Sequence, residues 1–431
     1  IFATFIAIWS TLFLETWKRK QSTYVMMWGM KGFEQQEITR PQFHGKETRS
    51  PIDDEPDVFF PAAESARRKT ISTVFLSLLI VFTIFLVGVV FFIKILLNQE
   101  PWVSRLLLFN LIPLSTIIPS ILNGVQITIM SITYDAVSLR LNDYENHRTD
   151  TGFEDSLIAK TFVFEFINKY AALLYIAFIK KHFVETDFCT GSCFVELGTT
   201  LGIIFLLALA TDNTLEVATT FLKQRKRQKE ESEGVAPDRL MSQVEKEYTA
   251  ETFDKMLGTF KEYAEMTFQF GYATLFSAAF PLAPLFALVN NFIEIRIDGW
   301  KLLQCSRRPE PSGAEDIGTW YGILELIAVA SVATNGLLIF FTGDGYENRS
   351  WSARFVLFAV FEHMLLMGKF ATAALVPDVP RSTEIQLARQ EFIEGKVIEN
   401  RPDDEADIAD DVEAEGGYEI DDGDPDPVFD T

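Results

Sequence analysis

The chain has 431 residues, of which 48% are hydrophobic and 13% aromatic, and it contains 39 phenylalanines. This composition indicates a polytopic membrane protein and argues against a soluble enzyme, so we expect no enzymatic activity. The formal net charge is −22, but residues 401–431 hold 14 acidic residues against one basic residue and contribute −13 of it. The acidity therefore belongs mainly to the tail. We find no nucleotide-binding glycine motif, and we expect no nucleic-acid partner.

Nine segments are apolar enough to be membrane-spanning helices. They lie at about 1–16, 70–97, 104–133, 161–180, 193–222, 258–280, 283–303, 317–341 and 352–376. The chain begins at Ile1, inside the first of these segments, so we expect a further piece to precede it. The pattern predicts an all-α transmembrane domain over 1–376, a cytosolic C-terminal segment over 377–400 and a disordered acidic tail over 401–431.

The placement of Lys and Arg predicts the orientation of these spans, because cytosolic loops carry an excess of both. The longest loop follows the first span, opens with Trp17–Lys20 (WKRK) and is placed in the cytosol. Alternation then puts the basic run Lys223–Lys229 and the C-terminus on the same side, and only Lys180, Lys181 and His182 depart from the rule. We expect an integral, multi-pass protein of the plasma membrane or the endoplasmic reticulum.

The stretch Glu262–Asp298 places two acidic pairs at opposite ends of an apolar run that contains Pro281 and Pro284. Two nearby prolines predict a helix, a tight turn and a second helix, so that both ends return to one side of the membrane. The pairs are Glu262 with Glu265 and Glu294 with Asp298, and spacings of three and four residues put each pair on one helical face. Four carboxylates are therefore expected to converge.

A third pair, Asp212 and Glu216, lies near the cytosolic end of the span 193–222, again four residues apart. At 1.5 Å of rise per residue, residues 212, 265 and 294 lie roughly 22, 22 and 16 Å inward from the outer ends of their helices. Three helices can thus share one acidic layer. Calcium takes about 6 to 8 oxygen ligands, so six carboxylates suit two calcium ions better than one.

An alternative is that these acids lie at helix ends in the membrane interface, solvated or paired with Lys261 and Arg296. A carboxylate inside a membrane costs roughly 3 kcal/mol on insertion scales, so convergence of three pairs favours a cation-binding function over this alternative. The sequence alone predicts a divalent-cation site that faces the cytosol.

The same residues resemble one known family. The stretch 262–298, with QFGYATLF, FPLAPLFALVNN and IEIRID, is similar to the anoctamin (transmembrane-16) family, and the resemblance extends to about Lys396. Further similar motifs are FLETWKRKQ (13–21), GFEQQE (32–37), FINKY (166–170), YIAFIKKHF (175–183), GSCFVEL (191–197), DIGTWY (316–321) and VPDVP (376–380).

The resemblance implies a homodimer with ten transmembrane helices per subunit. The nine spans would then be the second to tenth, and the first helix and the N-terminal cytosolic domain of the family would be missing. It also implies two calcium ions per subunit, held between the sixth, seventh and eighth helices. The implied ligands are the six acids named above: Asp212, Glu216, Glu262, Glu265, Glu294 and Asp298. Asp212 stands where the family usually has Asn.

Members of the family are calcium-activated anion channels or calcium-activated phospholipid scramblases, with a membrane-facing groove lined by the third to seventh helices. The span 104–133 would form one wall, and it is rich in polar side chains that would be costly to expose to hydrocarbon. They are Asn110, Ser115, Thr116, Ser120, Asn123, Gln126, Thr128 and Ser131. We expect lipid headgroups to follow this face. The alternative is that these side chains pack against neighbouring helices.

Charge decides between the two activities at this stage. Glu165 stands where the chloride channels of the family carry Lys, and no Lys or Arg occurs between Cys193 and Phe221. Both features disfavour anion conduction. We therefore expect a calcium-activated phospholipid scramblase with non-selective ion leak, with a chloride or cation channel and a membrane tether as alternatives. Glu165 could instead simply pair with Lys169.

The sequence has three cysteines. Cys189 and Cys193 are expected on the outer side, where they could form a disulfide with each other, bond elsewhere or remain free. Cys305 is expected to be a cytosolic thiol.

Overall fold

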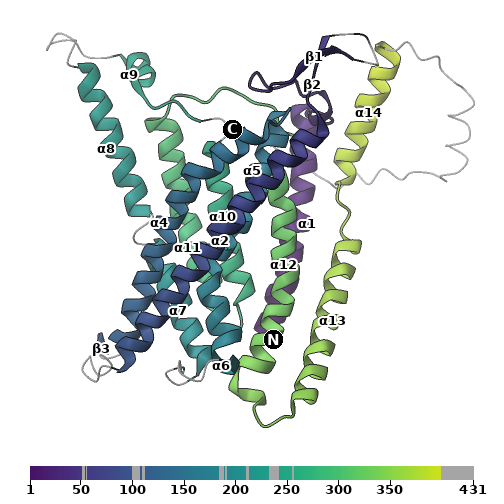
Figure 1. The fold of residues 1–431 in the computed structure, drawn as a ribbon. Helices are drawn as coiled ribbons and strands as arrows, with labels where there is room; N and C mark the ends of the chain where they lie inside the picture. Colours follow the sequence, from purple (N-terminus) through teal and green to yellow (C-terminus); the bar gives the residue numbers. More distant parts are fainter. Residues whose placement is uncertain are drawn as a thin grey trace, which may run out of the picture. The chain divides into compact units, whose positions relative to one another are not determined.

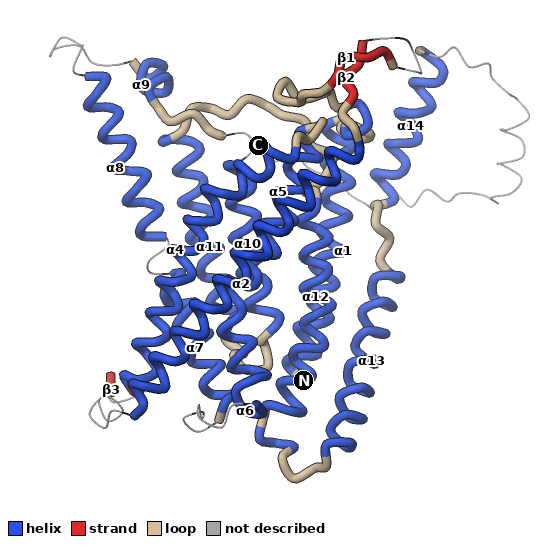
Figure 2. The backbone as a smooth tube through the Cα atoms, viewed as in Figure 1, coloured by secondary structure: helices blue, strands red, loops and turns tan. Residues whose placement is uncertain are grey.

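The computed structural model describes residues 1–50, 54, 56–99, 107–108, 112–183, 189, 192–209, 213–232, 242–254 and 257–398. It falls into two compact units, residues 1–378 and 379–431. Most of the described chain in the first unit is helical, as Figure 2 shows. The fold class is therefore all-α, as the sequence predicts.

The long helices of the first unit follow one another in the order of the apolar segments (Figure 1). Their bounds are α1 Phe2–Trp28, α2 Ala62–Gln99, α4 Leu114–Glu145, α5 Asp150–Leu174, α7 Cys193–Leu207, α8 Asn213–Ser232, α10 Leu257–Leu275, α11 Ala283–Trp300, α12 Thr319–Leu337 and α13 Trp351–Leu375. Short π-helical turns extend three of them: η2 (Tyr175–Ile179), η4 (Lys301–Cys305) and η5 (Leu338–Thr342). The remaining short helices are η1 (Glu34–Gln36), α6 (Lys180–Phe183), α9 (Gln243–Thr249) and η6 (Asp344–Tyr346).

Two antiparallel hairpins accompany the helices. Strand β1 (Lys46–Arg49) pairs with β2 (Pro56–Phe59), and β3 (Leu107–Leu108) pairs with β4 (Ile112–Pro113). The second hairpin occupies part of the segment where the sequence predicts a helix from residue 104. The helix begins only at Leu114, because Pro113 lacks an N–H and disfavours helical backbone at the residue before it.

Among the described residues, five helical stretches are long and apolar enough to cross a membrane. They are Ala62–Leu97, Ile117–Glu145, Asp150–Ile179, Thr319–Thr342 and Trp351–Leu375. Their outward-facing apolar side chains, such as Phe82, Phe85 and Ile132, are half or more exposed within the chain. Exposed apolar surface of this extent is expected where the surrounding solvent is lipid.

The main hydrophobic core joins α5, α7, α10 and α12. At its centre the buried Tyr170 hydroxyl on α5 donates to the Phe268 carbonyl on α10 at 2.7 Å. Gly271 makes this approach possible, since a Cβ at that position would overlap the Tyr170 hydroxyl. A glycine one turn beyond Thr267 on α10 therefore lets the two helices come into close contact.

The turn between α10 and α11 is held by one buried amide, Asn335 of α12. Its Oδ1 accepts from the Ser277 hydroxyl at 3.0 Å and from the Ala278 N–H at 2.8 Å, and its Nδ2 donates to the Thr274 carbonyl at 2.7 Å. The helix, turn and helix expected around Pro281 are thus present, with the chain reversing between Leu275 and Ala283. This reversal brings the two ends of the stretch 262–298 together.

Helices α1, α12 and α13 pack around a smaller core. The buried Lys369 of α13 donates to three oxygens of α1: the Ala7 carbonyl at 3.2 Å, Ser10 Oγ at 3.2 Å and Thr11 Oγ1 at 2.7 Å. Three acceptors match the three N–H donors of an ammonium group. Helix α13 is thereby attached to the beginning of the chain.

The second unit contains α14 (Arg381–Val397), which lies within the predicted C-terminal segment 377–400. The predicted acidic tail, residues 401–431, lies outside the described residues.

Candidate functional site

Five of the six predicted acidic ligands are described, and three helices supply them. Glu216 lies in the first turn of α8, Glu262 and Glu265 lie on α10, and Glu294 and Asp298 lie on α11. The sixth, Asp212, lies outside the described residues. Spacings of three and four residues direct both members of each α10 and α11 pair to one helical face, and the Pro281 turn sets those two faces side by side.

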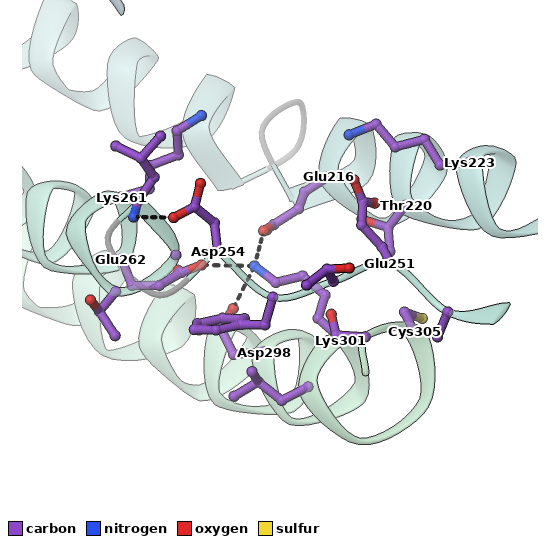
Figure 3. Close-up of a pocket in the computed structure, with 18 of the residues that line it drawn as sticks. Glu216, Thr220, Lys223, Glu251, Asp254, Lys261, Glu262, Asp298, Lys301 and Cys305 are labelled. Atoms are coloured by element: carbon purple, nitrogen blue, oxygen red, sulfur yellow. Dashed lines mark hydrogen bonds and ion pairs between the residues drawn. The ribbon is translucent and has the colours of Figure 1, made fainter. Parts of the chain in front are cut away.

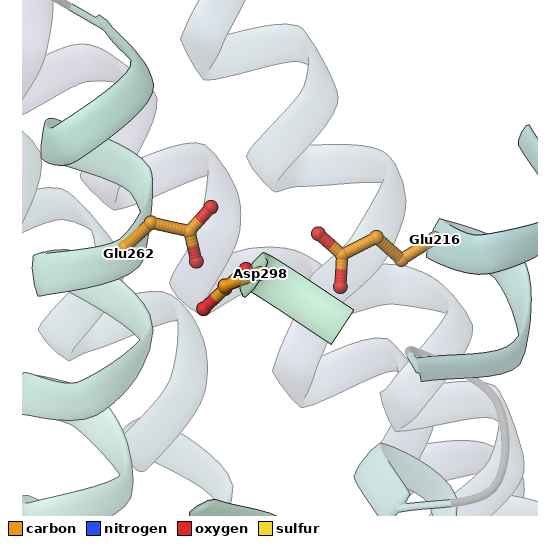
Figure 4. A group of neighbouring side chains, drawn as sticks. All are labelled: Glu216, Glu262 and Asp298. Atoms are coloured by element: carbon orange, nitrogen blue, oxygen red, sulfur yellow. The ribbon is translucent and has the colours of Figure 1, made fainter. Parts of the chain in front are cut away.

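Glu216, Glu262 and Asp298 form a first group of carboxylates, one from each helix (Figure 4). One oxygen from each lies within 4.8 Å of the other two. All three side chains are partly buried, with 29%, 37% and 26% of their surface exposed. We call this group the first triad.

Glu262, Glu265 and Glu294 form a second group with the same 4.8 Å limit, which we call the second triad. Glu294 is only 1% exposed, and its Oε2 has no hydrogen-bond partner in the part of the chain that the structure describes. A buried carboxylate oxygen without a donor is costly. Glu262 belongs to both triads, so the two groups share an edge.

Lys301 lies in the first triad, as Figure 3 shows. Its Nζ donates hydrogen bonds to Glu216 Oε1 and, at 2.9 Å, to Glu262 Oε1. It also forms an ion pair with Asp298 Oδ1 at 2.8 Å. Lys301 is not among the residues predicted from the sequence. The overlooked signal is its spacing: Glu294, Asp298 and Lys301 follow one another at four and three residues, on one face of the helix.

The site opens into a cavity of about 820 Å³ between α8, α10 and α11. Its wall carries acids of the first triad together with basic side chains, among them Lys223, Arg227 and Lys261. The cavity leaves room for hydrated ions to reach the carboxylates.

The donor set fits a hard divalent cation. Every candidate ligand is a carboxylate oxygen, which calcium prefers, whereas zinc favours His and Cys. The unpartnered Oε2 of Glu294 supplies a free lone pair at the second triad. Residues Glu216, Glu262, Glu265, Glu294 and Asp298 would together hold such ions.

In the alternative interpretation, the acids lie at helix ends and pair with Arg296 and Lys261. Arg296 instead donates to the Phe292 carbonyl at 2.6 Å and stacks on the Phe292 ring. Lys261 is exposed on the cavity wall. The cation that contacts Glu262 and Asp298 is Lys301.

The predicted groove residues lie along α4 and α5 where they are described. Asn123 and Gln126 of α4 are buried, and Ser120 is half-buried. Gln126 Nε2 donates to Asn168 Oδ1 at 3.0 Å. Asn110 lies outside the described residues, and Ser115 and Thr116 are described only as backbone of α4.

Glu165 is buried in the same α4–α5 seam. It accepts from the Ser131 hydroxyl at 3.0 Å and lies 3.7 Å from Lys169 Nζ, the partner that the simpler interpretation gives it. In this conformation Gln126 bonds to Asn168 and Ser131 bonds to Glu165 across the two helices, whereas Asn123 Oδ1 and Gln126 Oε1 have no hydrogen-bond partner among the described residues.

A second charged cluster, which the sequence analysis does not foresee, joins α2, α6 and α7. Glu196 accepts from Lys180 at 2.9 and 3.0 Å and from Lys94, and all three side chains are at most 5% exposed. Lys180, the apparent exception to the charge rule, is therefore neutralised inside the protein. Nearby, Cys189 and Cys193 form a disulfide, and Cys305 is a buried thiol.

The chain is similar to known proteins over most of its length. A family model described as "Anoctamin: Calcium-activated chloride channel" matches residues 1–390. Bovine anoctamin-4 is 34% identical over 368 residues, which is 80% of this chain and 40% of that protein. Human anoctamin-7 and human anoctamin-3 are each 29% identical, over 91% of this chain and 50% and 49% of their own lengths.

The chain thus spans about half the length, or less, of the curated relatives that it matches. The five apolar helices and the match over residues 1–390 together identify an integral, multi-pass membrane protein. An acidic site shared by three helices, in a chain that a calcium-activated family matches over most of its length, leads to one conclusion: the protein belongs to the anoctamin family.

Proposed function

We propose that this protein is a calcium-activated phospholipid scramblase whose sensor is the pair of carboxylate triads on α8, α10 and α11. The observation that carries the proposal is that five predicted ligands from three helices converge within 4.8 Å in two overlapping groups. The calcium-activated character of the family supports the choice of cation. Two ions per subunit would suit two triads.

Glu216 gives the sensor its mechanical role. It is the described acid that α8 contributes, whereas the other four lie on the α10–α11 hairpin. Bound calcium supplies positive charge that offsets the repulsion among these carboxylates. Glu216 then draws the beginning of α8 toward α10 and α11, and α8 changes its position relative to α4 and α5.

The lipid path would follow the polar side chains of α4. Gln126 and Glu165 make hydrogen bonds across the α4–α5 seam, so we infer that a path for headgroups requires these helices to separate and expose the seam. The polar residues there would then give up the hydrogen bonds that they make with one another and form hydrogen bonds with headgroups instead.

A second candidate is a calcium-activated ion channel, which the charged cluster at Glu196 favours. Lys94 and Lys180 both contact Glu196 in this cluster, and two buried ammonium groups would attract anions. The acidic Glu165 in the α4–α5 seam opposes anion passage.

The partners and the location are part of the proposal. We propose that phospholipids are the transported molecules, that the protein acts as a homodimer in the plasma membrane or endoplasmic reticulum, and that its C-terminus is cytosolic. Exposed apolar side chains on α13, including Phe355, Val360 and Phe370, offer surface for a partner subunit or for lipid.

The test is lipid scrambling by the full-length protein in liposomes that contain fluorescent phospholipids, with and without calcium. The Glu265→Gln/Glu294→Gln variant should lose the calcium response. A matched control, Glu391→Gln/Glu394→Gln, removes two exposed acids with a spacing of three on α14 and should keep it.

If calcium induces ion flux but no lipid movement, the protein is an ion channel and the scramblase proposal is wrong. Absence of both responses in the wild-type protein would favour a membrane tether. Calcium-dependent scrambling that survives in the Glu265→Gln/Glu294→Gln variant would reject the second triad as the sensor.

A further inference from the structure

We propose that Lys301 is a built-in competitor of calcium: its ammonium group occupies the first triad, and an ion binds there only by displacing it. The inference rests on the proposed function, because it concerns the regulation of the same sensor. It adds a basic residue to a site that is otherwise acidic.

The contacts of Lys301 match those of a bound cation. Its Nζ meets Glu216, Glu262 and Asp298, which are the three members of the first triad and come from three different helices. An ammonium group has three N–H donors; here two of them donate to Glu216 and Glu262, and Asp298 Oδ1 adds an ion pair at 2.8 Å. With 18% of its side chain exposed, Lys301 is largely buried, although it lines the cavity.

The backbone holds Lys301 in this position. Lys301 opens the π-helical turn η4, and its carbonyl accepts the Ser306 N–H at 2.9 Å. The side chain therefore starts from the same helical face as Asp298, three residues earlier, and a flexible four-carbon stem carries the charge. The stem would allow the ammonium to leave the triad without unfolding α11.

The two triads therefore differ in the charge that a calcium ion would meet on binding. The first already contains a positive charge, whereas in the second Glu294 Oε2 is buried without a hydrogen-bond partner among the described residues. Calcium would meet direct competition only at the first triad. Two ions that bind to one sensor would then bind with different affinities, and the weaker affinity would be set by Lys301.

The competition also links occupancy to the position of α8. While Lys301 is bound to Glu216, the single positive charge already holds α8 to α11. A divalent ion replaces one charge by two and frees the lysine to enter the cavity beside Lys223 and Arg227. The position of α8 should therefore differ less between the calcium-free and calcium-bound states than it would if Lys301 were absent from the carboxylates.

The test measures calcium binding rather than transport. Isothermal titration calorimetry of the purified full-length protein at constant pH should resolve two classes of sites. Lys301→Gln should tighten the weaker class about tenfold or more, since a nearby unit charge is removed, and should leave the tighter class within about threefold. Lys301→Arg keeps the charge and should keep the weaker class weak.

A matched control separates the contact from the general field of charges. Lys261→Gln removes the same charge from the wall of the same cavity, at a residue whose side chain is exposed. It should change both affinities less than about threefold, because solvent and salt screen exposed charges. An equal effect of Lys261→Gln and Lys301→Gln would overturn the inference.

A second measurement needs no variant and remains informative if Lys301→Gln does not fold. Amine labelling of the wild-type protein, followed by mass spectrometry, should modify Lys301 slowly without calcium and several-fold faster with calcium. The rate at Lys261 should not change. An unchanged Lys301 rate in protein that binds calcium would show that calcium does not displace the lysine.

Failure of the inference and failure of the proposed function give different results. If wild-type protein binds calcium and Lys301→Gln binds it with the same two affinities, the inference fails and the calcium sensor stands. If neither the wild-type protein nor Lys301→Gln binds calcium, the proposed sensor and the inference fail together.

Discussion

Glu196 pairs with two buried lysines, and its removal has a clear consequence. Glu196→Gln removes the carboxylate that Lys94 and Lys180 both contact, while both lysines stay buried. Breaking a buried ion pair in this way costs about 3 to 5 kcal/mol. We expect a marked fall in the thermal midpoint of the protein in detergent.

The control for Glu196→Gln is Lys181→Gln. Lys181 pairs with Glu347 at 2.8 Å but keeps 21% of its side chain exposed, so its loss should cost much less. A midpoint for Glu196→Gln as high as that of Lys181→Gln would mean that the buried lysines find other partners.

Glu34 provides a prediction that depends on pH. Partial desolvation, together with the nearby carboxylates of Asp316 and Glu315, raises the pKa of Glu34. Because the folded pKa lies above the unfolded one, the ionised carboxylate lowers stability at neutral pH, and this loss disappears as the pH falls through the raised pKa. Glu34→Gln should therefore raise the thermal midpoint at pH 7, and its advantage should vanish below about pH 4.3.

Thermal melts of wild type and Glu34→Gln across that pH range check this prediction. Glu47→Gln, which removes an exposed acid on β1, should give no comparable gain at pH 7. A gain for Glu34→Gln that stays constant down to acidic pH would rule out electrostatic repulsion as its cause.

At the scale of elements, the contact between α5 and α10 depends on one missing side chain. Gly271→Ala places a methyl group against the buried Tyr170 hydroxyl and should destabilise the protein by about 1 to 3 kcal/mol. Tyr170→Phe removes that hydroxyl, so the double variant should recover part of the loss. Thermal unfolding of the two single variants and the double variant measures the coupling; strict additivity would show that the two groups do not clash.

Helix periodicity explains why much of the site could be predicted and where prediction stopped. Acids three or four residues apart share a helical face, so the pairs on α10 and α11 can be identified within short windows of sequence. Glu196 has no such relation to Lys94, which is 102 residues away, and only the packing of α2 against α7 brings them together. Lys301 was within reach of the same reasoning, but it stands at a predicted span boundary, where the sign of a charge suggests topology rather than binding.

The polar side chains of α4 show a different limit. Their spacing indicates a polar face, but a polar face can line a lipid path or pack against a helix, and periodicity does not distinguish the two. The structure buries both Asn123 and Gln126, and Gln126 bonds to Asn168 of α5. The position at which α4 starts is likewise decided locally, by Pro113.

At the scale of the whole molecule, calcium should stabilise the folded protein. A ligand that binds only the folded state at a hundredfold excess over its dissociation constant adds about 2.7 kcal/mol. We expect the thermal midpoint to rise with calcium and to return after chelation. The Glu265→Gln/Glu294→Gln variant should lose most of the rise; an equal rise in wild type and variant would place the stabilising ions elsewhere.

Helices α7 and α8 are held very unequally. The beginning of α7 is fixed by the disulfide at Cys193, by the Ser192 cap and by Glu196 with its two lysines, whereas most side chains of α8 are exposed. A pair of consecutive helices that is fixed at one end can rotate about that end. We therefore expect α8 to move while the start of α7 stays in place. The space between α8 and the helices α4 and α5 would then open most near the triads. Headgroups of the leaflet nearest the sensor would enter first, and transport would begin from that leaflet.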